Sequence, residues 1–120
     1  TCWVAMTYSK VKTAFQVGPG EKLALVIAVG YGKNQGAGHK VKRPEEVMQA
    51  DGAVPEWFRR GVQAALLAPT AMNQQKFQFA LHGSCVTAKA GTGFYSKIDL
   101  GIVKYHFEIG AGKEHFQWGD

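Results

Sequence analysis

The sequence has few cysteines and no long hydrophobic run, and both shortages exclude classes of protein. Cys2 and Cys85 are the only two cysteines among 120 residues, fewer than a disulfide framework needs, and no His/Cys spacing matches a metal site. We therefore expect no metal ion and a reducing compartment, the cytoplasm. The longest apolar stretch, residues 23–29, has the length of a buried strand rather than a membrane span, and no secretory signal is visible.

Length and composition predict one globular domain over residues 1–120. Hydrophobic residues make up 46% of the chain, which is enough for a real core. The net charge of +5 permits an anionic partner without identifying one. The first residues are apolar and resemble the interior of a fold, whereas free termini are usually polar. We expect that the chain is the C-terminal part of something longer.

The periodicity of apolar residues predicts an α+β fold, with an antiparallel or mixed sheet and flanking helices. Residues 22–29 are continuously apolar after Lys22, as expected for a central strand covered on both faces. The other predicted elements are helices over 10–16, 44–48, 55–67 and 97–110, a hairpin formed by residues 77–81 and 85–89, and a docked tail or edge strand over 115–120.

The predicted helix over 97–110 has three features that bear on packing. Ser96 and Asp99 resemble a capping box with Asp in place of the usual Glu. Gly101 lies within the helix at a cost in helix propensity, which indicates close packing against another element. The apolar stripe that we expect to pack consists of Ile98, Ile102, Tyr105 and Ile109.

Residues 68–79 connect the predicted helix over 55–67 to the hairpin, and they are rich in hydrogen-bonding side chains. Thr70 carries a hydroxyl, and Asn73, Gln74 and Gln75 each carry an amide with a donor and an acceptor on one flat group. Such a loop could bind the mixed donor and acceptor edge of a planar heterocycle such as a flavin. Local composition by itself favours a polar connector between a helix and a strand over such a site.

A basic segment precedes the predicted helix over 44–48. It contains Lys33, His39, Lys40, Lys42 and Arg43, and no acidic residue lies between Lys33 and Glu45. Its position at a helix start favours an anion such as phosphate. A solvated basic loop explains the segment equally well, and a nucleic-acid surface is a weaker reading because no DNA- or RNA-binding motif accompanies it.

Taken together, several segments resemble the FMN-dependent nitroreductase family. Residues 68–77, Ala-Pro-Thr-Ala-Met-Asn-Gln-Gln-Lys-Phe, resemble its Ala-Pro-Ser-x-x-Asn-x-Gln-Pro-Trp motif. Residues 97–102, Lys-Ile-Asp-Leu-Gly-Ile, resemble a helix start in the branch whose two flavin-fold halves lie in one chain as a pseudo-dimer. The resemblance covers essentially all 120 residues and places them in the C-terminal half of that fold.

The resemblance implies a site and a reaction. Pro69, Thr70, Ala71, Asn73 and Gln75 would line FMN, and the pair Lys42 and Arg43 would meet its phosphate. NAD(P)H would give a hydride to the flavin, which would then reduce a nitroaromatic or quinone-like acceptor. This chemistry belongs to the cofactor, in agreement with the absence of a Ser-His-Asp order or paired carboxylates from the sequence.

The chain also departs from the family pattern. Lys76 and Phe77 replace the Pro and Trp of the motif, and the Arg-x-Ser-x-Arg phosphate clamp of the first half has no counterpart. Half of the flavin pocket would then come from another chain or from a second copy, as in a homo-oligomer. The alternative is a nitroreductase-like remnant that acts as an oligomeric structural or binding module without catalysis.

Overall fold

The computed structural model of the chain describes residues 2–5, 17–23 and 26–119. The chain divides into two compact units, residues 1–38 and 39–120, which are described separately. The helix predicted over 10–16 lies outside the described residues.

The first unit contains a two-stranded antiparallel ribbon. Its strands are β1 (Cys2–Ala5) and β2 (Val26–Val29), with Cys2 opposite Val29 and Ala5 opposite Val26. The prediction of a central strand covered on both faces is wrong, since among the described residues β2 pairs with β1 alone and the side chains of Ile27 and Val29 are 53% and 82% exposed. A continuously apolar strand is typical of one buried on both faces, but the sequence does not show which residues pack against those faces.

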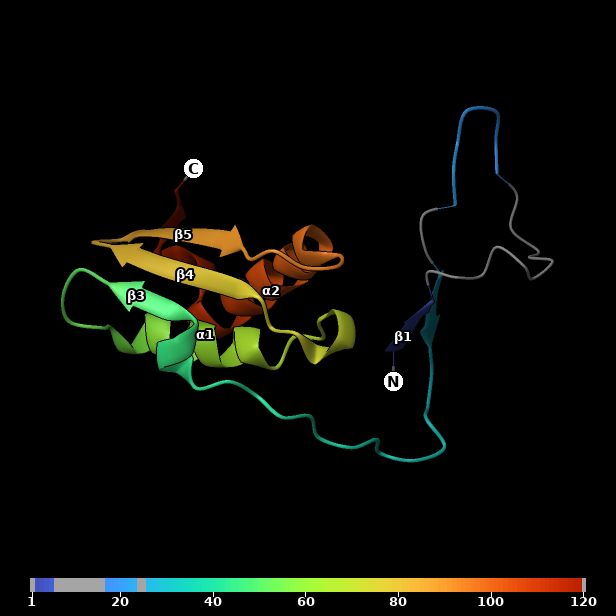
Figure 1. Cartoon of the computed structure of the whole chain (residues 1–120), viewed down its shortest axis with the longest axis horizontal. Helices are drawn as coiled ribbons and strands as arrows, with labels where there is room; N and C mark the ends of the chain where they lie inside the picture. The colour runs from blue at the N-terminus through green and yellow to red at the C-terminus, as the bar shows by residue number, and fades with distance from the viewer. Residues whose placement is uncertain (1, 6–16, 24–25, 120) are drawn as a thin grey trace. The chain divides into compact units, whose positions relative to one another are not determined.

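The second unit is built on a four-stranded mixed sheet (Figure 1). The strands are β3 (Met48–Ala50), β4 (Phe77–His82), β5 (Cys85–Ala90) and β6 (Gln117–Trp118), and this is also their order in the sheet. β4 and β5 form the predicted antiparallel hairpin, whereas β3 runs parallel to β4 and β6 runs parallel to β5. The predicted edge strand near the C-terminus is therefore confirmed as β6.

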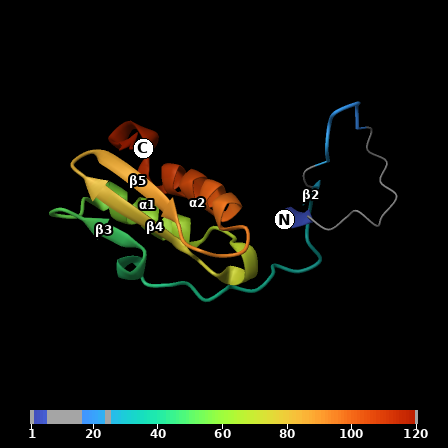
Figure 2. The same ribbon diagram turned by 45° about the horizontal axis from the view of Figure 1, so that its top comes forward.

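Two α-helices, α1 (Glu56–Leu66) and α2 (Ser96–Ala111), pack against each other and lie on the same face of the sheet (Figures 1 and 2). Both confirm predicted helices to within one residue at each end. Three short 3-10 helices complete the unit, η1 (Pro44–Glu46), η2 (Ala71–Asn73) and η3 (Lys113–His115). The helix predicted over 44–48 is correct only at its start, because residue 48 already belongs to β3, a strand too short to show a period of its own.

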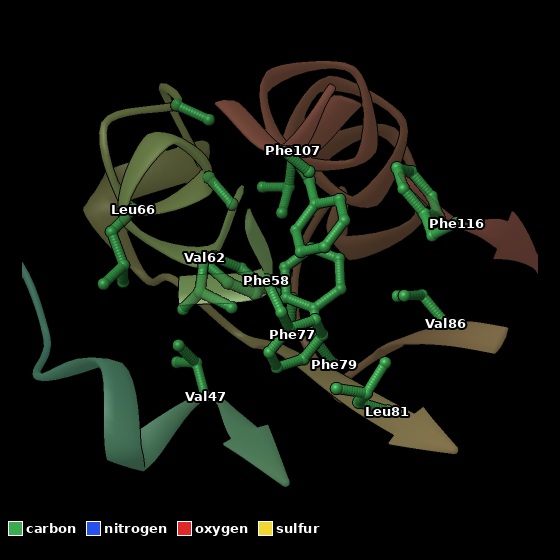
Figure 3. Close-up of a cluster of buried hydrophobic side chains, with 14 residues drawn as sticks. Val47, Phe58, Val62, Leu66, Phe77, Phe79, Leu81, Val86, Phe107 and Phe116 are labelled. Atoms are coloured by element: carbon green, nitrogen blue, oxygen red, sulfur yellow. The ribbon is translucent and has the colours of Figure 1, made fainter. Parts of the chain in front are cut away.

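The core lies between the sheet and the two helices (Figure 3). Phe79 of β4 stacks on Phe107 of α2 with ring centroids 4.6 Å apart, and Phe58 of α1 meets the same Phe107 ring edge-on at 5.6 Å. The first strand of the predicted hairpin alternates, since Phe77, Phe79 and Leu81 are buried while the intervening residues are not. Aromatic rings bury large apolar areas, so these contacts help to hold the helices on the sheet.

Helix α2 buries a different face from the one that the sequence predicts. Its buried residues are Asp99, Val103, Phe107 and Ala111. Of the predicted stripe, Ile102 is partly buried against the core, whereas the side chains of Ile98, Tyr105 and Ile109 are 44%, 64% and 67% exposed. The predicted stripe is wrong because α2 carries large apolar residues on both sides, so periodicity alone cannot select the packed face.

The predicted capping box at the start of α2 is also wrong. The residue before the helix is Tyr95, in a left-handed conformation with φ 55°, and no side chain caps the first turn. Asp99 is only 5% exposed, and its carboxylate accepts hydrogen bonds from outside the helix. The acid is therefore part of the interior rather than of a helix cap.

Close helix packing occurs at Gly61 rather than at Gly101. A β-carbon at Gly61 of α1 would lie 2.7 Å from Cε2 of Phe107, whereas a β-carbon at Gly101 would meet no atom within 4 Å in the described residues. The packing inferred for Gly101 is thus wrong. Gly61 lets α1 and α2 approach, as does Gly110 of α2, where a β-carbon would lie 2.7 Å from the carbonyl oxygen of Arg60 in α1.

Replacing Gly61 with Ala should therefore destabilise the fold, because the added methyl group displaces the Phe107 ring. We expect a loss of about 1–3 kcal/mol in the free energy of unfolding, measured by urea denaturation. Gly101→Ala is the matched control, since the same change within α2 enters open space and should be neutral or stabilise by up to about 1 kcal/mol. Equal effects of the two substitutions would contradict the packing assignment.

Candidate functional site

The connection between α1 and β4 holds a strained backbone. Met72, Asn73 and Gln75 have φ values of 51°, 53° and 47°, in the left-handed region that non-glycine residues seldom adopt. Each such residue costs on the order of 1–3 kcal/mol and persists only where its surroundings impose it. The loop over residues 70–75 is therefore held in place by specific contacts, and those contacts define the candidate site.

The side chain of Gln75 joins the loop to the basic segment. Gln75 is 3% exposed, and its Oε1 accepts a hydrogen bond from the backbone N–H of Lys42 at 2.9 Å. Its Nε2 donates to the carbonyl oxygen of Lys40 and to Oδ1 of Asn73, each at 2.8 Å. The ammonium of Lys42 donates to the Gln75 carbonyl oxygen at 3.0 Å. Residues 40–42 are thus fixed along the loop.

Asn73 and Thr70 support the same arrangement and keep part of their hydrogen-bonding capacity. Nδ2 of Asn73 donates to the Lys40 carbonyl oxygen at 2.9 Å, and Oγ1 of Thr70 accepts from the backbone N–H of Gln75 at 3.1 Å. The Thr70 hydroxyl hydrogen and the second Asn73 amide hydrogen have no partner among the described residues. Both are available to a ligand, because Asn73 is exposed and Thr70 half-buried.

Asp99 holds the other side of the loop. Its Oδ1 accepts from the backbone N–H of Ala71 at 2.9 Å, and its Oδ2 accepts from Nε2 of Gln74 at 2.7 Å. The same Nε2 donates to the carbonyl oxygen of Phe94 at 2.6 Å. The sequence interpretation missed this role by assigning Asp99 to a cap. The available signal was an acid placed between the apolar residues Ile98 and Leu100.

Arg43 adjoins the loop and is open to solvent. Its side chain is 83% exposed, and its Nε lies 3.4 Å from Oε2 of Glu46. The same carboxylate oxygen accepts the backbone N–H of Arg43 at 2.9 Å. An exposed ion pair of this kind contributes little to the stability of the fold, and the guanidinium remains able to bind an anion.

The structure brings most of the predicted site residues together. Gln75, Asn73, Thr70 and Lys42 are linked by hydrogen bonds, while Ala71 is tied to Asp99. The remaining two predicted residues, Pro69 and Arg43, are exposed beside them in the chain. Lys33 belongs to the other unit, and Lys40 contributes its carbonyl oxygen to the loop.

Two further findings concern classes of site. Within residues 2–5, 17–23 and 26–119, no group of three or more His, Cys, Asp or Glu side chains is placed to hold a metal ion. None of the helices in that part of the chain combines the length and apolar character needed to cross a membrane.

The pKa of Glu46 lies below the ordinary glutamate value, chiefly because the Arg43 backbone N–H donates to it, with a further contribution from the Arg43 guanidinium. Since the folded-state pKa is lowered, the stabilisation is present above the ordinary glutamate pKa and is lost as the pH falls through the folded value.

We expect Arg43→Ala to leave the Glu46 pKa still lowered, because the hydrogen bond from the backbone N–H of residue 43 remains. A carbon-detected NMR titration measures this, with Arg59→Ala as control. A Glu46 pKa that returns to the ordinary glutamate value in Arg43→Ala would contradict the dominant role of the backbone hydrogen bond.

Comparison with known proteins gives the family. A search of curated proteins found no match. A solved structure from Thermotoga maritima, titled a "putative nitroreductase", has the same fold with a TM-score of 0.58 at 20% sequence identity. The match covers 81% of this chain and 43% of the other, so the chain spans less than half of that protein's length. The family model described as "Putative TM nitroreductase" matches residues 1–111. The chain therefore belongs to this nitroreductase family.

Proposed function

We propose that this chain supplies one wall of the flavin site of an FMN-dependent NAD(P)H oxidoreductase of the nitroreductase type. One observation carries the proposal: the buried Gln75 side chain joins the basic segment directly to the loop over residues 70–75. Hydrogen-bond donors for a polar ring edge and positive charge for a phosphate therefore occur side by side. FMN is a ligand that needs both. A reducing compartment, the cytoplasm, suits a chain in which Cys85 is a free thiol.

The described residues fit FMN along one wall. The Thr70 hydroxyl and the Asn73 amide would donate to the ring edge, and the exposed Arg43 guanidinium would hold the phosphate. Gln75 would act from behind the wall, since its amide is buried and already bonded to Lys40, Lys42 and Asn73. When bound, FMN supplies hydride transfer between NAD(P)H and a nitroaromatic or quinone-like acceptor.

The chain's own residues would bind and orient the cofactor. The strained loop is fixed on both sides by protein hydrogen bonds, so its donors need little further ordering when a ligand arrives. The Lys42 ammonium, bonded to the Gln75 carbonyl oxygen, would add positive charge close to the phosphate. No side chain of the loop is required to transfer a proton.

Arg43→Ala tests the phosphate role. Loss of a charge-assisted hydrogen bond should weaken FMN binding roughly tenfold, whereas riboflavin, which lacks the phosphate, should change by less than about twofold. Flavin fluorescence quenching measures both dissociation constants. Arg59→Ala is the matched control, because Arg59 is an exposed arginine on α1, away from the loop.

Two outcomes contradict this assignment. An equal loss of affinity for FMN and riboflavin in Arg43→Ala would remove the phosphate role. A purified protein without flavin absorbance near 450 nm (roughly the position expected of a bound flavin) that also cannot be reconstituted with FMN would remove flavin chemistry for this chain.

The exposed side of α2 favours a second candidate function, an oligomeric structural or binding module without catalysis. Tyr105 and Ile109 lie four residues apart on one side of the helix and are 64% and 67% exposed, and apolar side chains grouped in this way are typical of interaction surfaces. A second copy of this chain, covering α2, is the partner we propose under either function.

Ile109→Lys should weaken self-association about tenfold or more, because it places a charge in the apolar contact. Sedimentation velocity over a concentration series measures the association. Gln63→Lys is the matched control, since Gln63 is exposed on α1. A chain that is monomeric, or whose association is unaffected by Ile109→Lys, would contradict the partner. An oligomer that cannot be loaded with FMN would favour the second function.

A further inference from the structure

Asp99 carries a buried carboxylate and is not one of the residues proposed to bind the ligand. We infer that Asp99 is a positioning residue: from α2 it sets the conformation of residues 70–75, and so the affinity of a ligand site that it does not touch. The part of the inference that concerns ligand affinity rests on the proposed function. The part that concerns loop conformation stands on the structure without a ligand.

The two oxygens of Asp99 hold both ends of the short helix η2. Oδ1 accepts the backbone N–H of Ala71, the first residue of η2, and Oδ2 accepts the side chain of Gln74, the residue that follows η2. Between these two anchors lie Met72 and Asn73, both in the left-handed conformation. One carboxylate thus spans the strained turn and holds it closed.

Gln74 links this anchor to the segment before α2. Its Nε2 bonds both Asp99 and the Phe94 carbonyl oxygen. Its Oε1 occupies space that a β-carbon at Gly93 would enter, so the segment before α2 is shaped around this side chain. The loop is therefore attached to α2 and to the residues that lead into it.

The same loop carries the basic segment on its other side. Gln75 follows Gln74 directly, and its amide fixes Lys40 and Lys42. Movement of the loop away from Asp99 would displace the Asn73 amide and the Lys42 ammonium together. Asp99 consequently controls the hydrogen-bonding group and the charge of the proposed site through one set of contacts.

The chemistry of the contact requires a carboxylate. Both atoms that face Asp99 are donors, the Ala71 N–H and the Gln74 amide nitrogen. Asparagine has nearly the same shape but presents an NH₂ group to one of these donors, which breaks a hydrogen bond and brings two donors together. Asp99→Asn is therefore a test with minimal change in volume.

The first measurement is amide hydrogen exchange by NMR on the full chain without ligand. Asp99→Asn should raise the exchange rates of the Ala71, Gln75 and Lys42 amides by about tenfold or more. Gln74→Met, which removes only one of the two bonds to Asp99, provides a milder variant should Asp99→Asn fail to fold. Unchanged exchange at these amides in a folded variant would overturn the inference.

Glu108→Gln is the matched control. Glu108 is a second partly buried carboxylate on α2, and its Oε1 accepts Nε1 of Trp118 at 2.7 Å, near the opposite end of the helix. This variant should lower the melting temperature without raising exchange at the three loop amides. Equal increases in Glu108→Gln and Asp99→Asn would show a general loss of stability and would overturn the positioning role.

The second measurement is the FMN dissociation constant of the same variants. We expect Asp99→Asn and Gln74→Met to weaken FMN binding several-fold, about in proportion to the change in loop exchange, and Glu108→Gln to leave it unchanged. An unmodified chain that binds no FMN would remove the proposed function, and the exchange data would then decide the loop role alone. FMN affinity unaltered by faster loop exchange would overturn the ligand part of the inference.

Discussion

The hydrogen bonds of one buried amide determine the shape of the candidate site. Gln75 is 3% exposed, so its donors and acceptor must be bonded within the protein. The partners are the Lys40 carbonyl oxygen, the Asn73 amide and the Lys42 backbone N–H. A segment more than thirty residues away in the sequence is thereby held against the loop without regular secondary structure of its own. The juxtaposition of charge and polar groups follows from satisfying that single side chain.

The parts of the fold that the sequence predicts are those with a clear period and clear boundaries. The helix α1 has Pro55 before it and a regular apolar face, and the hairpin β4–β5 alternates on both sides of Gly83. The amides of the loop between them permit a ligand site, and the resemblance of residues 68–77 to the nitroreductase motif is what favours one over a polar connector. The face of α2 could not be predicted, because Ile98 and Ile109 compete with Val103 and Phe107 for burial. Which side packs depends on partners distant in the sequence.

The role of individual polar residues was harder to predict than the elements that carry them. Asp99 has the spacing of a cap, but the decisive fact is that two donors from the loop face it in three dimensions. The resemblance places Gln75 along FMN, and the sequence does not show that its side chain is 3% exposed and bonded to residues 40–42. The position of Arg43 could be predicted without tertiary information, because the sequence places it at the start of a helix. Its side chain is exposed in the fold. Local position is readable from sequence, whereas the direction of a side chain is not.

The outer strands of the sheet bear on how this unit meets other chains. β3 and β6 are three and two residues long, and each runs parallel to its inner neighbour. Such short borders leave few unpaired backbone groups, which limits extension of the sheet by a strand from another molecule. Growth of the sheet through these two strands is therefore disfavoured. Part of the exposed apolar surface of the unit, at Ile98, Tyr105 and Ile109, lies on helix α2, whose backbone groups are already paired along the helix.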